Sequence, residues 1–100
     1  MKYNIIIRPD AKKDLGDSYQ WYQDHVPGLG VEFMYCVDEA LDRIVENPNL
    51  YQEIYKNVRR VLTRRFPYGI FYIIEGNDII ILAVFHVKRD PQLLKERRSE

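Results

Sequence analysis

The chain has 100 residues, of which 46% are hydrophobic, 30% charged and 13% aromatic, which fits one folded domain, residues 1–100, and excludes a second core or a disordered chain. The formal net charge is zero, but residues 1–55 hold five basic and ten acidic side chains, and residues 56–100 hold ten basic and five acidic ones. The local net charge is therefore −5 in the first half and +5 in the second. This difference predicts a basic surface in the second half that binds an anion or an acidic partner.

Several classes of protein and site are excluded by what the sequence lacks. Cys36 is the one cysteine, so no disulfide forms within the chain and a buried free thiol is expected. The apolar start, residues 1–7, is too short for a secretory signal, and no apolar run reaches the roughly 18 residues of a membrane span. We therefore expect a cytoplasmic protein. One cysteine and two distant histidines predict no metal site, and no cofactor is expected.

The first element is predicted to be a strand over residues 2–8. Three consecutive isoleucines, residues 5–7, are typical of a strand that is buried on both faces and therefore central in its sheet. Pro9 ends this strand, and Asp10 is the expected N-cap of a helix that runs to about His25. The helix is predicted by an apolar stripe at spacings of three and four: Ala11, Leu15, Tyr19, Tyr22 and Val26.

A second helix is predicted over residues 29–46, and Pro27-Gly28 makes the turn that precedes it. Asn47-Pro48 ends this helix. Its apolar stripe consists of Phe33, Val37, Leu41 and Ile44. Two consecutive helices joined by a short turn form an antiparallel hairpin.

The rest of the chain is predicted to be mostly β-structure. Strands are expected over residues 52–56 (or a loop there), 58–66, 69–75 and 79–88. Gly76-Asn77-Asp78 is the expected hairpin turn, and residues 79–85 are all apolar, which predicts a central last strand. Residues 91–98 form a short helix or a tail. The fold class is therefore α+β: an N-terminal strand and an antiparallel two-helix hairpin on a mostly antiparallel sheet of four to five strands.

Four arginines lie in the predicted strand 58–66. Because side chains alternate along a strand, Arg60 and Arg64 are expected on one face, and Arg59 and Arg65 on the other. A pair of arginines on one face suits phosphate, since each guanidinium donates two hydrogen bonds at once. The alternative is a solvent-exposed edge strand whose charges prevent aggregation.

A second polar group closes the predicted last strand, at His86, Lys88 and Arg89. Strand geometry would point His86 and Lys88 the same way. The histidine is either a general acid or base or a structural hydrogen-bonding residue. Arg60, Arg64, Lys88 and Arg89 together make up the predicted basic functional surface.

Four segments, in this order, resemble the RelE/ParE superfamily of toxins from bacterial type II toxin–antitoxin pairs. Residues 7–15 are similar to the strand and "P-x-A-x-x-D-L" motif of that superfamily, and a two-helix hairpin follows, ending at residues 46–48. Residues 66–72 match "F-P-Y-x-I-x-Y", and residues 86–91 match the ParE-type ending "H-x-x-R-D-P". The resemblance covers nearly the whole chain and implies the α+β fold described above.

The resemblance implies one of two activities. RelE-like members cut messenger RNA in the ribosomal A site, and a match to them would assign catalysis to His86, Arg60 and Arg89, with Arg64 at a further basic position. ParE-like members inhibit DNA gyrase and need no catalytic set.

The sequence departs from the RNase pattern at three places. Leu62 stands where an alternating lysine is expected, Gly69 stands where the RNases place an arginine, and no tyrosine follows Arg89. An arginine lost from that group removes stabilisation of the phosphate, typically a few kcal/mol. These departures favour the ParE-like branch.

The resemblance therefore implies the toxin of a plasmid-stabilisation pair, with DNA gyrase as target, a cognate antitoxin as partner in a toxin–antitoxin hetero-oligomer, and no role for a membrane. Two alternatives stay open. One is a ribosome-dependent mRNA endoribonuclease. The other is a degenerate, non-enzymatic member whose basic sheet mainly holds its antitoxin.

Overall fold

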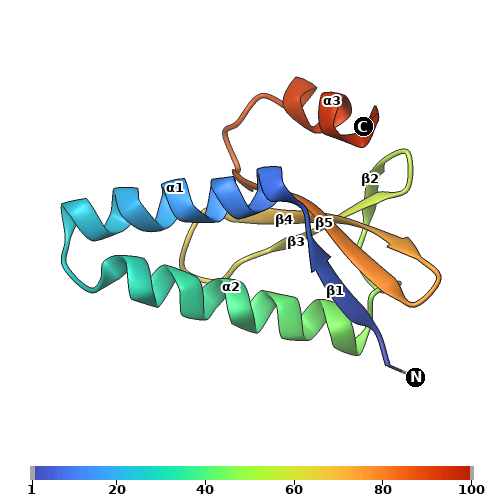
Figure 1. Ribbon diagram of the computed structural model, residues 1–100, viewed down its shortest axis with the longest axis horizontal. Helices are drawn as coiled ribbons and strands as arrows, with labels where there is room; N and C mark the ends of the chain where they lie inside the picture. Colours follow the sequence, from blue (N-terminus) through green and yellow to red (C-terminus); the bar gives the residue numbers. More distant parts are fainter. Residues whose placement is uncertain (1, 100) are drawn as a thin grey trace.

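A two-helix hairpin covers one face of a five-stranded sheet in the computed structural model, which describes residues 2–99 (Figure 1). The helices of the hairpin are α1 (Pro9–His25) and α2 (Leu29–Glu46). The strands are β1 (Asn4–Ile7), β2 (Glu53–Tyr55), β3 (Val58–Leu62), β4 (Tyr68–Glu75) and β5 (Asp78–His86). A last helix, α3 (Gln92–Ser99), packs on the opposite face. The α+β fold class is confirmed.

The sheet has the strand order β1-β5-β4-β3-β2, in which β1 and β5 are parallel and the other pairs antiparallel. β5 lies between β1 and β4, which confirms that the last strand is central. The β4–β5 hairpin turns through Gly76 and Asn77, and Gly76 has a φ of 61°, a backbone conformation that glycine adopts without steric cost. Asp78, expected in this turn, is the first residue of β5.

The prediction that the first strand is central is wrong, because β1 is an edge strand. Within residues 2–99 its one partner is β5, with Ile6 opposite Ile80, and Ile6 is 44% exposed. A run of isoleucines predicts an extended backbone but says nothing about how many neighbours the strand has. Here β4 already occupies the other side of β5 through the tight hairpin.

The helix boundaries are close to those expected. Arg8 rather than Asp10 is the N-cap of α1, and Pro9 takes the first helical position, where its fixed φ and missing N–H suit the helix. The bounds of α2 are confirmed at both ends. Cys36 of α2 is a free thiol, but it is half-buried rather than buried. None of the helices among residues 2–99 has the length and apolar character needed to cross a membrane.

The main core lies between the hairpin and the sheet. Phe33, Val37 and Ile44 of α2 are fully or almost fully buried against apolar side chains of β3, β4 and β5. Tyr72 of β4 is also fully buried there, and its hydroxyl donates a hydrogen bond of 2.7 Å to the carbonyl oxygen of Pro48. This bond ties the end of α2 to the middle of the sheet.

The phenol of Tyr72 predicts a pH dependence of stability. Burial raises its pKa to about 12, above the ordinary value near 10, so the folded state retains the proton longer than the unfolded state. The contribution to the free energy of unfolding, about 2–3 kcal/mol, is fully present below pH ~10 and is lost between pH ~10 and ~12. Tyr72→Phe lacks this component, so its stability deficit relative to the wild type should shrink over that window. Urea unfolding of both proteins measures it, and a deficit that does not change with pH would contradict the assignment.

Candidate functional site

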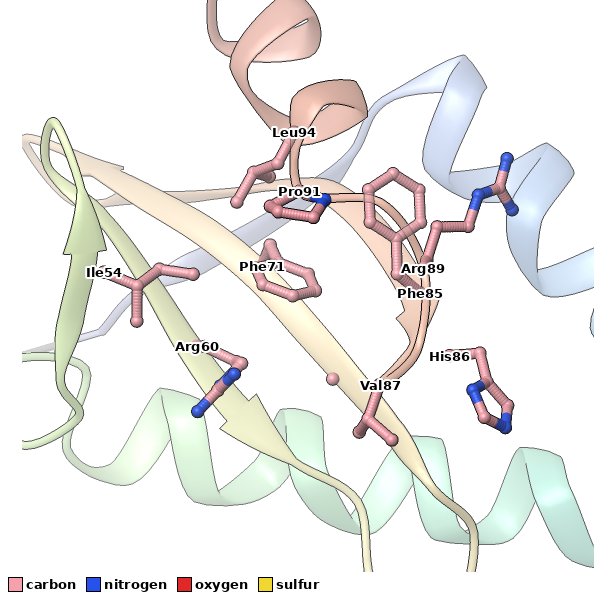
Figure 2. Close-up of a pocket in the computed structure, with 10 residues that line it drawn as sticks. Ile54, Arg60, Phe71, Phe85, His86, Val87, Arg89, Pro91 and Leu94 are labelled. Atoms are coloured by element: carbon pink, nitrogen blue, oxygen red, sulfur yellow. The ribbon is translucent and has the colours of Figure 1, made fainter.

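The face of the sheet opposite the hairpin carries a cavity of about 210 Å³, the Phe71/Phe85 cavity (Figure 2). Its walls come from four strands, β2 to β5, from the loop after β5 and from α3. The apolar side chains are Ile54, Phe71, Phe85, Val87, Pro91 and Leu94. Arg60 and Arg89 lie on different sides of these apolar residues (Figure 2).

A β-bulge places Phe85 on the cavity face. Phe71 pairs with Ala83 but Tyr72 pairs with Ile81, so β5 has one extra residue, Leu82. Before the bulge Ile81 faces the hairpin core, and after it the even-numbered residue Val84 does. Since a single inserted residue reverses which face the following side chains take, Ala83 and Phe85 turn to the cavity side.

The same bulge sends His86 to the other face. His86 borders the cavity, but its ring points away from Arg60 (Figure 2). The ring lies 5.4 Å from the ring of Tyr68, which packs against the hairpin core. The backbone N–H of Lys88 donates to its Nδ1 at 3.1 Å. In the neutral ring, Nδ1 is therefore the acceptor and Nε2 carries the proton.

Lys88 lies beyond the end of β5, in an exposed turn. The predicted strand over residues 79–88 is two residues too long, because the backbone turns where the N–H of Arg89 donates to the carbonyl of His86 at 2.9 Å. Strand alternation therefore does not relate His86 to Lys88.

Arg60 is positioned by Gly69, its diagonal neighbour on β4. A Cβ atom at Gly69 would lie 3.2 Å from both Cγ and Cδ of Arg60, closer than ordinary van der Waals contact, so the Arg60 stem lies across the bare backbone of Gly69. The register supports this, since Arg60 pairs with Phe71, two residues further along β4. The Arg60 stem thus occupies the space that a side chain at position 69, such as the arginine of the RNase pattern, would need.

The prediction that Arg60 and Arg64 share a face is wrong. β3 ends at Leu62, and Arg64 follows in a loop, where its Nη1 lies 3.7 Å from Oε2 of Glu39 on α2. The loop is shaped by Thr63, whose buried hydroxyl donates to the carbonyl of Phe66 at 2.7 Å. Alternation applies only inside a strand, so Arg64 lies beside the hairpin while Arg60 lies at the cavity.

A buried ion pair that the sequence reasoning missed anchors α3. Arg97 donates to both carboxylate oxygens of Asp14, at 2.5 and 3.0 Å, and to the carbonyl of Leu82 at 3.2 Å. Asp14 also accepts the backbone N–H of Val84 at 3.0 Å. The pair thus provides hydrogen-bond partners for the carbonyl of Leu82 and the N–H of Val84. These groups of β5 lie beyond the last residue that pairs with β1, Ile81. The one sequence signal for it is the aspartate in the "P-x-A-x-x-D-L" segment.

Both Arg97 and Arg89 pack on the ring of Phe85. Their guanidinium carbons lie 4.7 and 4.9 Å from the ring centroid, within the range of a cation–π interaction. The ion pair of Arg97 therefore holds α3, and with it Leu94, against the wall of the cavity. Within residues 2–99, no three His, Cys, Asp or Glu side chains gather in a way that suits a metal ion.

A family model described as the ParE toxin of the type II toxin–antitoxin system parDE matches residues 5–91 of the chain. The chain belongs to the ParE toxin family. It is also 27% identical to Toxin ParE2 of Mycobacterium tuberculosis over 101 aligned positions, which cover 99% of this chain and 95% of that protein.

The fold of this ParE-family protein is shared with solved structures. A chain of the chromosomal ParDE toxin–antitoxin system from P. aeruginosa superposes with a TM-score of 0.74 at 19% identity, covering 85% of this chain and 96% of that one. A mutant of the E. coli toxin RelE in the free state gives 0.64 at 13% identity, covering 100% and 94%. The toxin–antitoxin complex RelBE2 from Mycobacterium tuberculosis gives 0.59 at 18% identity, covering 86% and 99%. At these identities the likeness concerns the fold.

Proposed function

We propose that this ParE-family toxin inhibits DNA gyrase, without chemistry of its own, and that a cognate antitoxin neutralises it in a plasmid-stabilisation pair. The observation that carries the proposal is that the RNase-type side chains do not converge: Arg60, His86 and Arg89 line one cavity but point in different directions (Figure 2). Cleavage of RNA needs an acid, a base and cations around one phosphate. Here the bulge in β5 turns His86 toward the hairpin, and the loop after β3 takes Arg64 to Glu39. Arg60 is left on the cavity face without Arg64, and the ring of His86 at the edge of the cavity points away from it.

The surface that remains suits a protein better than a phosphodiester. Arg60 and Arg89 are exposed at an apolar cavity, and Lys88 is exposed in the turn between the lining residues Val87 and Arg89. Such a combination of apolar anchors and arginine is typical of protein–protein contacts. We assign the contact with the target to this surface. The location that follows from a gyrase target is the cytoplasm.

An antitoxin partner is supported by the structural relatives. The P. aeruginosa ParDE system is a toxin–antitoxin system, and the RelBE2 structure is a toxin–antitoxin complex. We infer a hetero-oligomer of the same kind for this toxin.

The test is induced expression in a bacterial host without the antitoxin, with plasmid supercoiling, gyrase–DNA breaks and transcript ends measured in the same culture. Growth arrest with breaks and altered supercoiling, and with intact transcripts, is expected. Lys12→Ala removes an exposed cation of α1 that does not line the cavity. As a control, this variant should arrest growth and alter supercoiling as the wild type does. Normal supercoiling without breaks during arrest would rule out gyrase. Transcripts cut within codons would point to the RNase, and harmless expression to a module that only binds its antitoxin.

A further inference from the structure

The Phe71/Phe85 cavity combines an apolar interior with positive charge. The charged residues among those that line it are Arg60 and Arg89, and none of the lining residues is an aspartate or glutamate. We propose that it binds an acidic peptide segment, which inserts one bulky apolar side chain into the cavity and places carboxylates at Arg60 and Arg89. The inference rests on the proposed function in one respect, since it assigns this segment to the antitoxin.

The size of the cavity limits its occupant. Pockets for drug-sized ligands and cofactors span roughly 300–1,000 Å³, whereas this cavity measures about 210 Å³. It therefore suits a single large side chain that is attached to a chain outside. A buried anchor of this kind, surrounded by a polar rim, is how protein interfaces concentrate their binding energy.

The geometry of the aromatic rings favours a side chain over a nucleobase. Phe71 and Phe85 have centroids 5.7 Å apart and planes inclined by 52°, so they do not form a slot between parallel rings. Stacking on a flat aromatic surface is what makes single-stranded nucleic acid bind at such sites. An aliphatic or aromatic side chain tolerates the inclined walls, to which Leu94 and Ile54 add aliphatic surface.

The two arginines have no carboxylate partner within residues 2–99. The ion pairs of this region are made by other cations: Lys13, Arg43, Arg64, Arg65 and Arg97. Arg89 is held by its contact with the Phe85 ring, and Arg60 by its position across Gly69. Both arginine side chains are therefore positioned before the peptide binds. Carboxylates on either side of the inserted apolar side chain would accept charge-assisted hydrogen bonds from them.

The test uses the purified full-length toxin and a probe hexapeptide, blocked at both ends, with Leu-Phe at its centre and two glutamates on each side. Backbone amide shifts are followed by NMR during titration at low salt. Shifts should centre on Phe71, Phe85 and Leu94. Two matched peptides serve as controls, one with Ser-Ser at the centre and one with lysines in place of the glutamates, and both should bind at least tenfold more weakly.

Three variants of the toxin localise the effect. The double substitution Arg60→Ala/Arg89→Ala is expected to weaken binding at least tenfold, and binding to the wild type should fall as salt rises, because exposed charges are screened. Val87→Asp places a negative charge on a rim side chain that is 52% exposed, so it should weaken binding without affecting folding. Arg64→Ala, which lies beside α2, should bind as the wild type does.

Several results would overturn the inference. Equal binding of the lysine peptide, shifts confined to the α1–α2 hairpin, or tighter competition by a ten-nucleotide single-stranded DNA or RNA would each exclude an acidic peptide site here. A toxin that binds the peptide as described but leaves supercoiling normal would refute the gyrase target and not the site. Gyrase inhibition by a toxin that does not bind the peptide would refute the peptide site and leave the gyrase target in place.

Discussion

Asp14→Ala is expected to lower the free energy of unfolding by about 3–5 kcal/mol, the usual effect of removing one partner from a buried ion pair. The Asp14 side chain is 7% exposed and that of Arg97 is 17% exposed. The substitution removes both carboxylate acceptors of the Arg97 guanidinium, which also donates to the carbonyl of Leu82, and removes the acceptor of the Val84 N–H. Urea unfolding followed by circular dichroism measures the change.

The ion pair of Lys13 with Asp17, one turn further along α1, supplies the control. These side chains are 75% and 70% exposed, and exposed pairs contribute about 0–1 kcal/mol, so Asp17→Ala should change stability by less than 1 kcal/mol. Asp14→Leu/Arg97→Met, which replaces both charges by apolar side chains, should recover much of the loss. If Asp14→Ala and Asp17→Ala have similar effects, the Asp14–Arg97 pair does not anchor α3 as described.

Arg60→Ala and Arg64→Ala are expected to differ sharply, although the two arginines look equivalent in the sequence. Arg60→Ala removes a cation at the cavity that has no carboxylate partner among residues 2–99. Because hydrogen bonds to charged groups contribute about 1.5–3 kcal/mol, it should weaken binding to the target roughly ten- to a hundredfold. Arg64→Ala removes an exposed side chain that lies 3.7 Å from Glu39, so toxicity should be retained.

The measurement is plating efficiency over a series of inducer concentrations, with protein levels checked by immunoblot. Arg60→Ala should need far more inducer to arrest growth than the wild type, and Arg64→Ala the same amount. Thermal unfolding of both variants separates loss of binding from loss of folding. Equal toxicity of the two variants would exclude the cavity face as the contact with the target.

Local patterns in the sequence were sufficient for most of the framework. Apolar residues at spacings of three and four predicted both helices, with α2 (Leu29–Glu46) at its observed bounds. The unbroken apolar run predicted a central β5, and the ordered motifs indicated the toxin superfamily. The helices depend on interactions between residues that are close in the chain. The burial of a central strand is indicated by the apolar composition of that strand alone.

The arrangement of the candidate site was decided by tertiary structure. The extra residue in β5 reverses the alternation after Leu82, so Phe85 faces the cavity and His86 faces the hairpin. Nothing in the apolar run marks where a bulge falls, because apolar side chains suit both faces of a covered strand. The end of β3 at Leu62 likewise separates Arg60 from Arg64.

Long-range pairings decided the rest. Asp14 and Arg97 are 83 residues apart in the chain and meet only because α1 and α3 both lie against β5. The edge position of β1 follows from the β4–β5 hairpin on the other side of β5. The sequence by itself thus determined which segments are helices and strands and which family the chain resembles. Which side chains meet was decided by the folded sheet, because strand register, bulges and strand order depend on contacts between segments that are distant in the chain.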